Sequence, residues 1–113
     1  MKYALLIYPG RAEEYELLSE EEQRSILGEY QALVQEPGVF GAEQLQPAES
    51  ATTVRVDDGR TLTTDGPFAD SKEILGGLYL LEAENLDRAL DLAARIPAAR
   101  MGGAVEVRPL VER

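Results

Sequence analysis

The chain carries, at residues 64–82, the stretch Thr64-Asp65-Gly66-Pro67-Phe68-Ala69-Asp70-Ser71-Lys72-Glu73-Ile74-Leu75-Gly76-Gly77-Leu78-Tyr79-Leu80-Leu81-Glu82. Its first part predicts a turn, because an Asp-Gly-Pro run interrupts regular structure. Its last part is apolar on both alternating faces, with Leu78 and Leu80 on one face and Tyr79 and Leu81 on the other. A strand of this kind is covered on both sides, so we expect residues 77–83 to form a buried strand.

Three further strands are expected in the main sheet. Residues 2–8 are also apolar on both faces, which predicts a central strand that ends at Pro9-Gly10. Residues 39–45 predict a second strand, and residues 104–110 predict a last one. In that last strand Val105 and Val107 face inward and Glu106 and Arg108 lie on the opposite face.

Two amphipathic helices are expected between these strands. Ser19 and Glu22 form a capping box, and apolar residues recur at helical spacing from Ile26 to Val34. A second helix is expected to begin at the cap Asn85 and to end before Pro97. Residues 11–18 predict only a loose helical turn.

A hairpin and a glycine pair complete the local pattern. Residues 52–56 and 61–64 are rich in β-branched side chains and are joined through Asp58-Gly59, which is a strong hairpin signal. Gly76-Gly77 lacks the Lys-Ser/Thr that follows the glycines of a P-loop. We therefore expect the pair to permit close approach of the backbone.

The order of the elements predicts the fold class. Without the hairpin it is βαββαβ, which is an α+β plait of the ferredoxin-like type with an inserted β-hairpin. Two helices of this size cover one face of a four-stranded sheet, yet two of the strands are apolar on both faces. The simplest cover for the second face is another copy of the same sheet. We therefore expect a homodimer, in which two sheets form a dimeric α+β barrel.

Composition narrows the possible functions. The 113 residues correspond to one domain, 1–113, and 44% of them are hydrophobic. The chain has no cysteine and no histidine, which excludes disulfides, thiolate chemistry and the commonest general base. The net charge of −10 argues against nucleic acid and anionic membranes as partners. No apolar run approaches the ~20 residues of a bilayer span, and no signal peptide is recognised, so we expect a cytoplasmic protein.

Several motifs along the chain resemble one known family. These are the stretch at residues 64–82 already quoted, the N-terminal residues 2–8, Ala51-Thr52-Thr53-Val54-Arg55, and the ending Val105-Glu106-Val107-Arg108-Pro109-Leu110. Together they resemble the DGPF branch of the YCII-related family, over essentially the whole chain. The resemblance implies the same ferredoxin-like plait and dimeric α+β barrel.

The resemblance implies less about activity than about the fold. Proteins of the wider family are suspected enzymes with a His-Asp pair in a pocket, and one branch is tied to dehydrochlorination of chlorinated hydroxyquinols. Similar DGPF proteins are often encoded beside extracytoplasmic-function sigma factors. This chain has the aspartate, Asp65, but related sequences often have histidine where it has Met101. A His-Asp mechanism therefore does not carry over.

Asp65 is the first candidate for a catalytic residue. A carboxylate held before Gly66-Pro67 and partly desolvated has the chemistry of a general acid or base. The structural interpretation is that its side chain bonds to nearby backbone amides, as aspartates in turns do. The structural interpretation is favoured, and the two can hold at one site.

Four residues are candidates for ligand binding. Lys72 can hold an anion near Asp65, although a solvated charge beside an Asp70 cap is the favoured interpretation. Arg108 can bind a carboxylate that Glu106 keeps in place, or both can face water, and neither interpretation is preferred. Tyr79 can offer a phenolic donor to a pocket or can serve only in packing. No cofactor and no metal is predicted.

Two functions follow as hypotheses. In the first, a homodimer binds a small polar or aromatic molecule and Asp65 acts as acid or base in an isomerisation, elimination or hydrolysis. In the second, the protein is a non-catalytic ligand-binding or regulatory module, with the sigma-factor neighbourhood as the reason to consider signalling. The missing histidine adds weight to the second.

Overall fold

The computed structural model describes residues 1–10, 12–68 and 73–113. Lys72 and Asp70 lie outside these ranges. The elements follow in the order β1 (Lys2–Tyr8), α1 (Ala12–Glu16), α2 (Glu20–Leu33), β2 (Val39–Gln44), the 3-10 turn η1 (Ala48–Ser50), β3 (Thr52–Asp57), β4 (Arg60–Asp65), β5 (Gly77–Glu82), α3 (Leu86–Ala94), the 3-10 turn η2 (Pro97–Arg100) and β6 (Ala104–Pro109).

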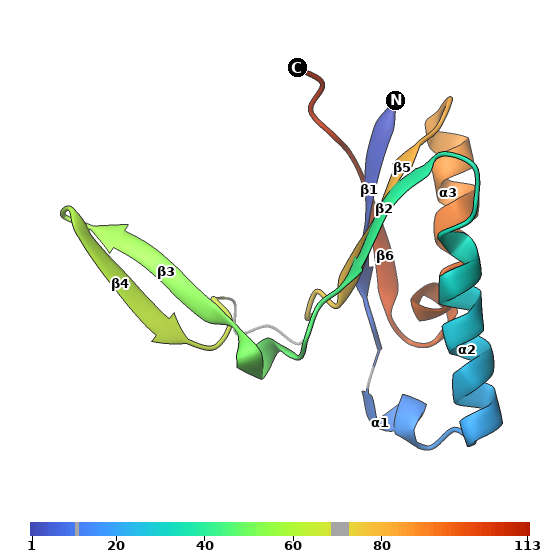
Figure 1. Ribbon diagram of the computed structural model, residues 1–113, viewed down its shortest axis with the longest axis horizontal. Helices are drawn as coiled ribbons and strands as arrows, with labels where there is room; N and C mark the ends of the chain where they lie inside the picture. Colours follow the sequence, from blue (N-terminus) through green and yellow to red (C-terminus); the bar gives the residue numbers. More distant parts are fainter. Residues whose placement is uncertain (11, 69–72) are drawn as a thin grey trace.

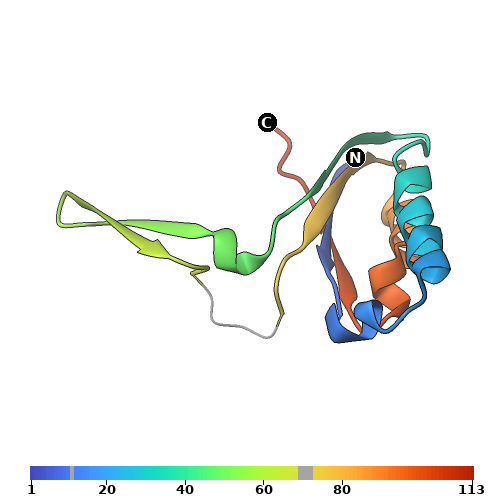
Figure 2. The ribbon, with the colours of Figure 1, turned by 60° about the horizontal axis from the view of Figure 1, so that its bottom comes forward.

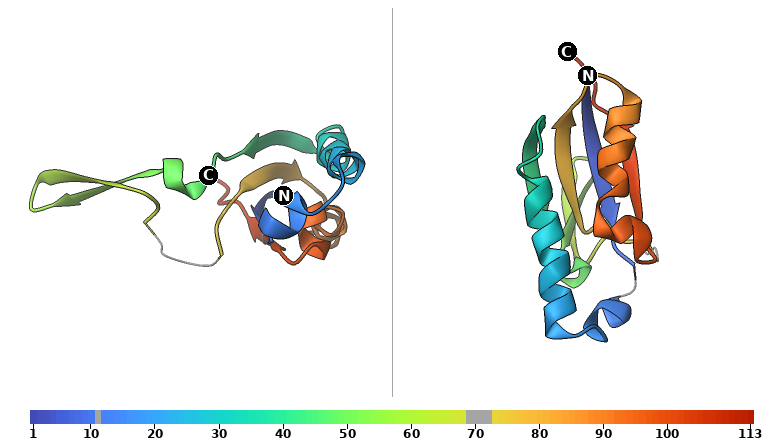
Figure 3. Two further views of the ribbon diagram at one scale, coloured as in Figure 1. Left: turned by 90° about the horizontal axis from the view of Figure 1, so that it is seen from below. Right: turned by 90° about the vertical axis from the view of Figure 1, so that its right-hand side faces the viewer.

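Four strands form one antiparallel sheet in the order β2-β5-β1-β6. The helices α2 and α3 lie side by side over one face of this sheet, and no α-helix of the described residues lies across the opposite face (Figures 1 and 3). The architecture is mixed α+β and is compatible with a ferredoxin-like fold. The residues expected to form a loose turn contain α1, which lies at one end of the sheet and not across its open face (Figure 3).

The core lies between the sheet and the two helices. The alternation in β1 places Tyr3, Leu5 and Ile7 on this side, where all three are buried. Tyr79 and Leu81 of β5 are buried on the same side. The helices and the segment after α3 contribute further buried side chains, which are Leu33, Ala89, Leu92, Ala93, Ile96 and Ala98.

The first turns of α2 and α3 are capped by side chains that lie close to them in the sequence. At α2, the Ser19 Oγ accepts a hydrogen bond from the Glu22 amide at 3.1 Å, and the Ser19 amide donates to Glu22 Oε1 at 3.4 Å. This confirms the capping box. At α3, Asn85 Oδ1 accepts from the Arg88 amide at 3.0 Å, as expected of an N-cap.

The strands β3 and β4 form a separate two-stranded sheet. Their turn has positive φ at Asp58 (49°) and Gly59 (75°), the pattern that suits the right-handed twist of a hairpin. The pair extends away from the main sheet on the side opposite to the helices (Figures 1 and 2). We call the segment Thr52–Asp65 the arm.

An ion-pair group joins the end of α2 to α3. Glu36 lies 2.6 Å from Arg95 and 3.5 Å from Arg88. The hydrogen bond from Arg95, followed by the charges of both arginines, lowers the pKa of the Glu36 carboxyl from its usual 4.5. Since α2 and α3 are far apart in sequence, this group links them across the helical layer.

We expect the variant Glu36→Gln to lose stability at neutral pH but not in acid. A carboxyl whose pKa is lower in the folded state stabilises that state above its unfolded pKa, and this stabilisation disappears as pH falls through the folded value. The difference from wild type should therefore be largest near pH 7 and should shrink as the pH falls below 4.5. Urea unfolding at several pH values measures it, with the C-terminal Glu112→Gln as a charge control. A difference that stays constant with pH would contradict this assignment.

Candidate functional site

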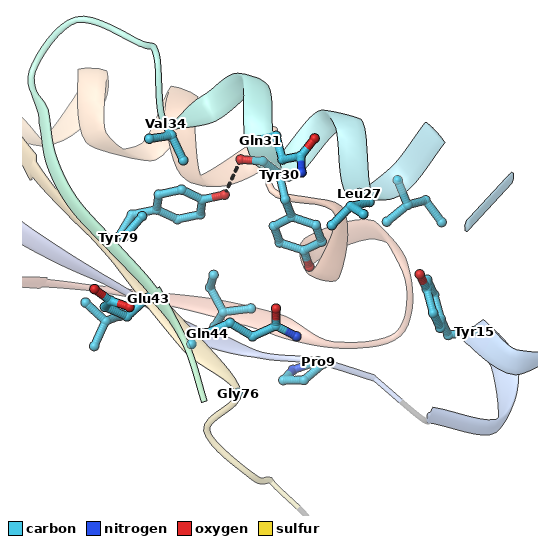
Figure 4. Close-up of a pocket in the computed structure, with 15 residues that line it drawn as sticks. Pro9, Tyr15, Leu27, Tyr30, Gln31, Val34, Glu43, Gln44, Gly76 and Tyr79 are labelled. Atoms are coloured by element: carbon cyan, nitrogen blue, oxygen red, sulfur yellow. Dashed lines mark hydrogen bonds between the residues drawn. The ribbon is translucent and has the colours of Figure 1, made fainter. Parts of the chain in front are cut away.

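A cavity of about 480 Å³ lies between α2 and the main sheet (Figure 4). Its lining residues come from α2, from the strands and from two connecting segments. They are Ile26, Leu27, Tyr30, Gln31 and Val34 from α2 and the residue after it, Ile7, Ala42, Glu43, Gln44, Gly77, Leu78 and Tyr79 from the strands, and Pro9, Tyr15 and Gly76 from their surroundings.

The cavity exists because α2 does not pack closely against this part of the sheet. Leu33 is the one α2 residue that is buried, while Leu27 and the following Val34 remain 49% and 42% exposed. The sheet opposite offers small residues there, including Ala42 and the pair Gly76-Gly77. A Cβ at Gly76 would lie 2.7 Å from Pro9 Cγ, and one at Gly77 would lie 2.8 Å from the Glu43 carbonyl oxygen. The predicted close backbone approach at this pair is therefore confirmed.

A second cavity of about 250 Å³ adjoins the first. The two share four lining residues: Pro9, Tyr15, Ile26 and Tyr30. The second cavity is also lined by Met101. The two cavities therefore form one extended site that includes this position.

Tyr79, which is buried, and Tyr30, which is half-buried, supply much of the polarity of the site. The Tyr79 hydroxyl donates a 2.7 Å hydrogen bond to the carbonyl oxygen of Tyr30, and burial raises the pKa of Tyr79 to about 12 (Figure 4). Burial also raises the pKa of Tyr30, against the opposing effects of the Ala98 backbone and Arg100. Both phenols are therefore protonated at neutral pH, where they form hydrogen bonds but do not act as general bases.

Asp65 lies at the end of the arm and does not line either cavity within one protomer. Its side chain is exposed, and its strand partner is Thr52. The following turn is tied down by two hydrogen bonds. The Gly66 amide donates to the Ala51 carbonyl oxygen at 2.7 Å, and the Thr53 hydroxyl donates to the Gly66 carbonyl oxygen at 2.7 Å. The carboxylate thus projects from a fixed backbone, and its catalytic role stays a prediction.

The other predicted ligand-binding residues lie in different places. Tyr79 lines the first cavity. Glu106 and Arg108 are exposed on the open face of the sheet, where they form an ion pair with each other at 2.5 Å. Lys72 lies outside the described residues. The structure therefore brings Tyr79 to the cavity and keeps Asp65, Glu106 and Arg108 away from it in the single protomer.

Several residues that line the site are not marked as such by the sequence. Tyr30 belongs there to the apolar stripe of α2, and Tyr15 and Gln44 lie in no recognisable motif. A tyrosine within an otherwise aliphatic stripe could have indicated a lining residue, because a phenol usually needs a partner for its hydroxyl. Ala42 could not have been found, since its contribution is the space that it leaves empty.

Within the described ranges, no cluster of three or more carboxylates is placed to hold a metal ion. In the same part of the chain, no helix is both long enough and apolar enough to cross a bilayer.

The model of the YCII-related domain family matches residues 1–113. An uncharacterised protein of Rhizobium meliloti (strain 1021), R00369, is 39% identical over 114 residues, which cover 97% of this chain and 92% of that protein. The chain belongs to the YCII-related domain family.

Proposed function

We propose that the protein is a homodimeric binding module for a small molecule, which occupies the extended site between α2 and the main sheet. One observation carries this proposal. Two adjoining cavities of about 480 and 250 Å³ share four lining residues and include Met101, where relatives in the proposed DGPF branch often place histidine. A total of this size is typical of pockets for small ligands, and such pockets are mostly apolar with a few polar groups.

The residues that line the two cavities indicate which kind of ligand would bind there. Most lining side chains are aliphatic or aromatic, and the hydrogen-bonding groups are phenols and amides from Tyr15, Tyr30, Gln31 and Gln44. No lysine or arginine lines either cavity in the described part of the chain, whereas Glu14 lines the second cavity. With a net charge of −10 on the whole chain, an anion is disfavoured. We therefore propose a neutral ligand with an aromatic or apolar body and one or two hydrogen-bonding groups.

The binding role takes precedence over a catalytic one for a chemical reason. The residue at the position of the histidine is methionine, and the phenols in the site have raised pKa values. The regulatory link to sigma-factor signalling remains part of this proposal. The catalytic alternative, in which Asp65 is the acid or base, needs a second protomer to bring this carboxylate to the cavity. The hydrogen-bonded turn after Asp65 holds this carboxylate in a fixed position, and for this reason we keep the catalytic function as the second candidate.

Two features support the homodimer. The open face of the sheet carries Leu6, Leu78, Leu80 and Phe40, and Phe40 is 51% exposed. The chain also exposes 8469 Å² of surface, whereas a compact monomer of its mass exposes about 6,100 Å². The excess, about 2,300 Å², is well above the ~800 Å² that each partner buries in a standard interface. A second copy packed on this face would complete the proposed dimeric α+β barrel.

Filling the cavity should abolish ligand binding. We expect a thermal-shift screen of neutral aromatic molecules to find ligands that stabilise the wild type, by about 2.7 kcal/mol at 100 times the dissociation constant. In Ala42→Phe the larger ring occupies the space beside Tyr79, so the same ligands should give no shift. The matched control is Ala94→Phe on the exposed side of α3, which should bind as the wild type does. Unchanged binding by Ala42→Phe would place the ligand elsewhere.

The same ligands separate the two candidate functions. If the protein is a binding module, Asp65→Asn should keep the ligand affinity within about twofold, and no product should form with either protein. Turnover by the wild type that is lost in Asp65→Asn, with the fold intact by circular dichroism, would instead establish the catalytic alternative.

A further inference from the structure

Within the described ranges, the arm leaves almost all of its side chains exposed. Every residue of β4 is exposed, and Thr53 is the one residue of β3 that is not. Val54, Val56 and Leu62 are 60%, 69% and 48% exposed. An isolated two-stranded hairpin is at best marginally stable in water, because it has no third element against which to bury its side chains. The arm therefore needs a partner to be held in its extended form.

The two faces of the arm differ in chemistry. The register pairs Val54 with Thr63 and Val56 with Thr61, so these four side chains share one face. All four are β-branched and uncharged, and we call this the valine face. The other face carries Arg55, Asp57 and Arg60 beside Leu62, and the Arg55 guanidinium lies 5.4 Å from the Phe68 ring centre. One face thus suits a dry contact and the other suits solvent or an interface rim.

The register also places Asp65 on the valine face. Asp65 lies opposite Thr52, two residues along each strand from the pair Val54 and Thr63. Whatever covers the valine face therefore lies beside the Asp65 carboxylate.

The direction of the arm indicates that its partner is a second copy of this chain. The arm leaves the main sheet on the same side as the open face (Figures 1 and 2). Two sheets that pack face to face lie ~10 Å apart, whereas a six-residue strand spans ~20 Å. In the proposed dimer the arm must therefore run past the interface and along the partner subunit.

Shape and charge agree with this partner. The radius of gyration is 16.1 Å, whereas a compact chain of this length has about 13 Å. The arm contains two arginines and three aspartates, so it carries little of the net charge of −10. It is therefore a segment that two acidic protomers can bring together with little repulsion.

We infer that the arm is an intersubunit clasp, whose valine face packs on the second copy of the chain and brings Asp65 of one protomer to the surface of the other. The inference rests on the proposed homodimer and adds a second contact region to the open sheet face. It also places the catalytic candidate Asp65 at a site shared between two subunits.

The first test is hydrogen exchange of the arm amides at protein concentrations above and below the dimer dissociation constant. We expect residues 52–65 to be protected in the dimer and to exchange at least about 100-fold faster in the monomer, because a free hairpin is marginal. Fast exchange of the arm in a sample that sedimentation equilibrium shows to be dimeric would overturn the clasp and leave the sheet-face dimer standing. A wild type that is monomeric at all concentrations would overturn both.

The second test uses charges on each face of the arm. The variant Val54→Asp, Val56→Asp should raise the dissociation constant of the dimer by at least about 100-fold, since it buries carboxylates without partners. The matched variant Leu62→Asp, Thr64→Asp places the same two charges on the opposite face and should change the constant by less than about 10-fold. Equal dissociation constants for the two variants would overturn the assignment of the valine face.

Discussion

The Leu80→Asp variant is expected to be a monomer at concentrations at which the wild type is a dimer. Leu80 lies in the middle of the open sheet face, between Ala4 of β1 and Gly41 of β2. In the proposed dimer this position is buried, and an unpaired buried charge costs about 3–5 kcal/mol. Two-fold symmetry places two such charges in one interface, so we expect the dissociation constant to rise by at least ~10²-fold.

Sedimentation equilibrium or light scattering measures this change. The matched control is Leu90→Asp on α3, where a leucine is 46% exposed on the helical side of the molecule. That variant should stay dimeric, because the same charge then faces water. If Leu80→Asp remains a folded dimer, the open face is not the interface, and the proposed barrel would have to be abandoned.

Gly103→Ala is expected to destabilise the fold strongly. An added Cβ at Gly103 would lie 2.2 Å from the carbonyl oxygen of Tyr8 and 2.7 Å from the amide nitrogen of Gly10. Both neighbours are backbone atoms at the end of β1, so neither can rotate away as a side chain can. We expect a loss of about 3 kcal/mol, at the upper end for overpacking, and a Tm lowered by roughly 10–20 °C.

Gly28→Ala is the matched control for this substitution. Gly28 lies inside α2, and a Cβ there meets no atom within 4 Å. Alanine is the better helix former, so this variant should be stabilised by about 0.5–1 kcal/mol. The Tm values of the wild type and the two variants are compared by thermal unfolding at one protein concentration. Equal effects of the two substitutions would contradict the close approach of Gly103 to the end of β1.

Local features of the fold were predictable because they depend on neighbours a few residues away. The Ser19–Glu22 capping box and the Asn85 cap form as expected, since each hydroxyl or amide oxygen reaches an amide three residues on. The alternation in β6 was also predictable. Val105 and Val107 face the helices, and Glu106 and Arg108 face away, because successive side chains of a strand point to opposite faces.

The site was predictable only in part. The glycine pair at residues 76–77 was interpreted correctly as a point of close backbone approach, and Tyr79 does line the cavity. The apolar stripe of α2, in contrast, gave no sign that Leu27 and Val34 would line a cavity instead of filling the core. A helical stripe has the same spacing in both cases, because the spacing reports the face of the helix and not its distance from the sheet.

Local sequence patterns specify which segments become helices and strands, in what order, and which strands are apolar on both faces. These properties are carried by side-chain periodicity and capping, which act over a few residues. Two features emerge only when the chain packs in three dimensions: α2 stands off the sheet above Ala42 and the glycine pair, and the arm extends past the open face. Both features depend on how side chains that are far apart in the sequence pack together in one volume. A pattern of a few neighbouring residues carries no information about this packing.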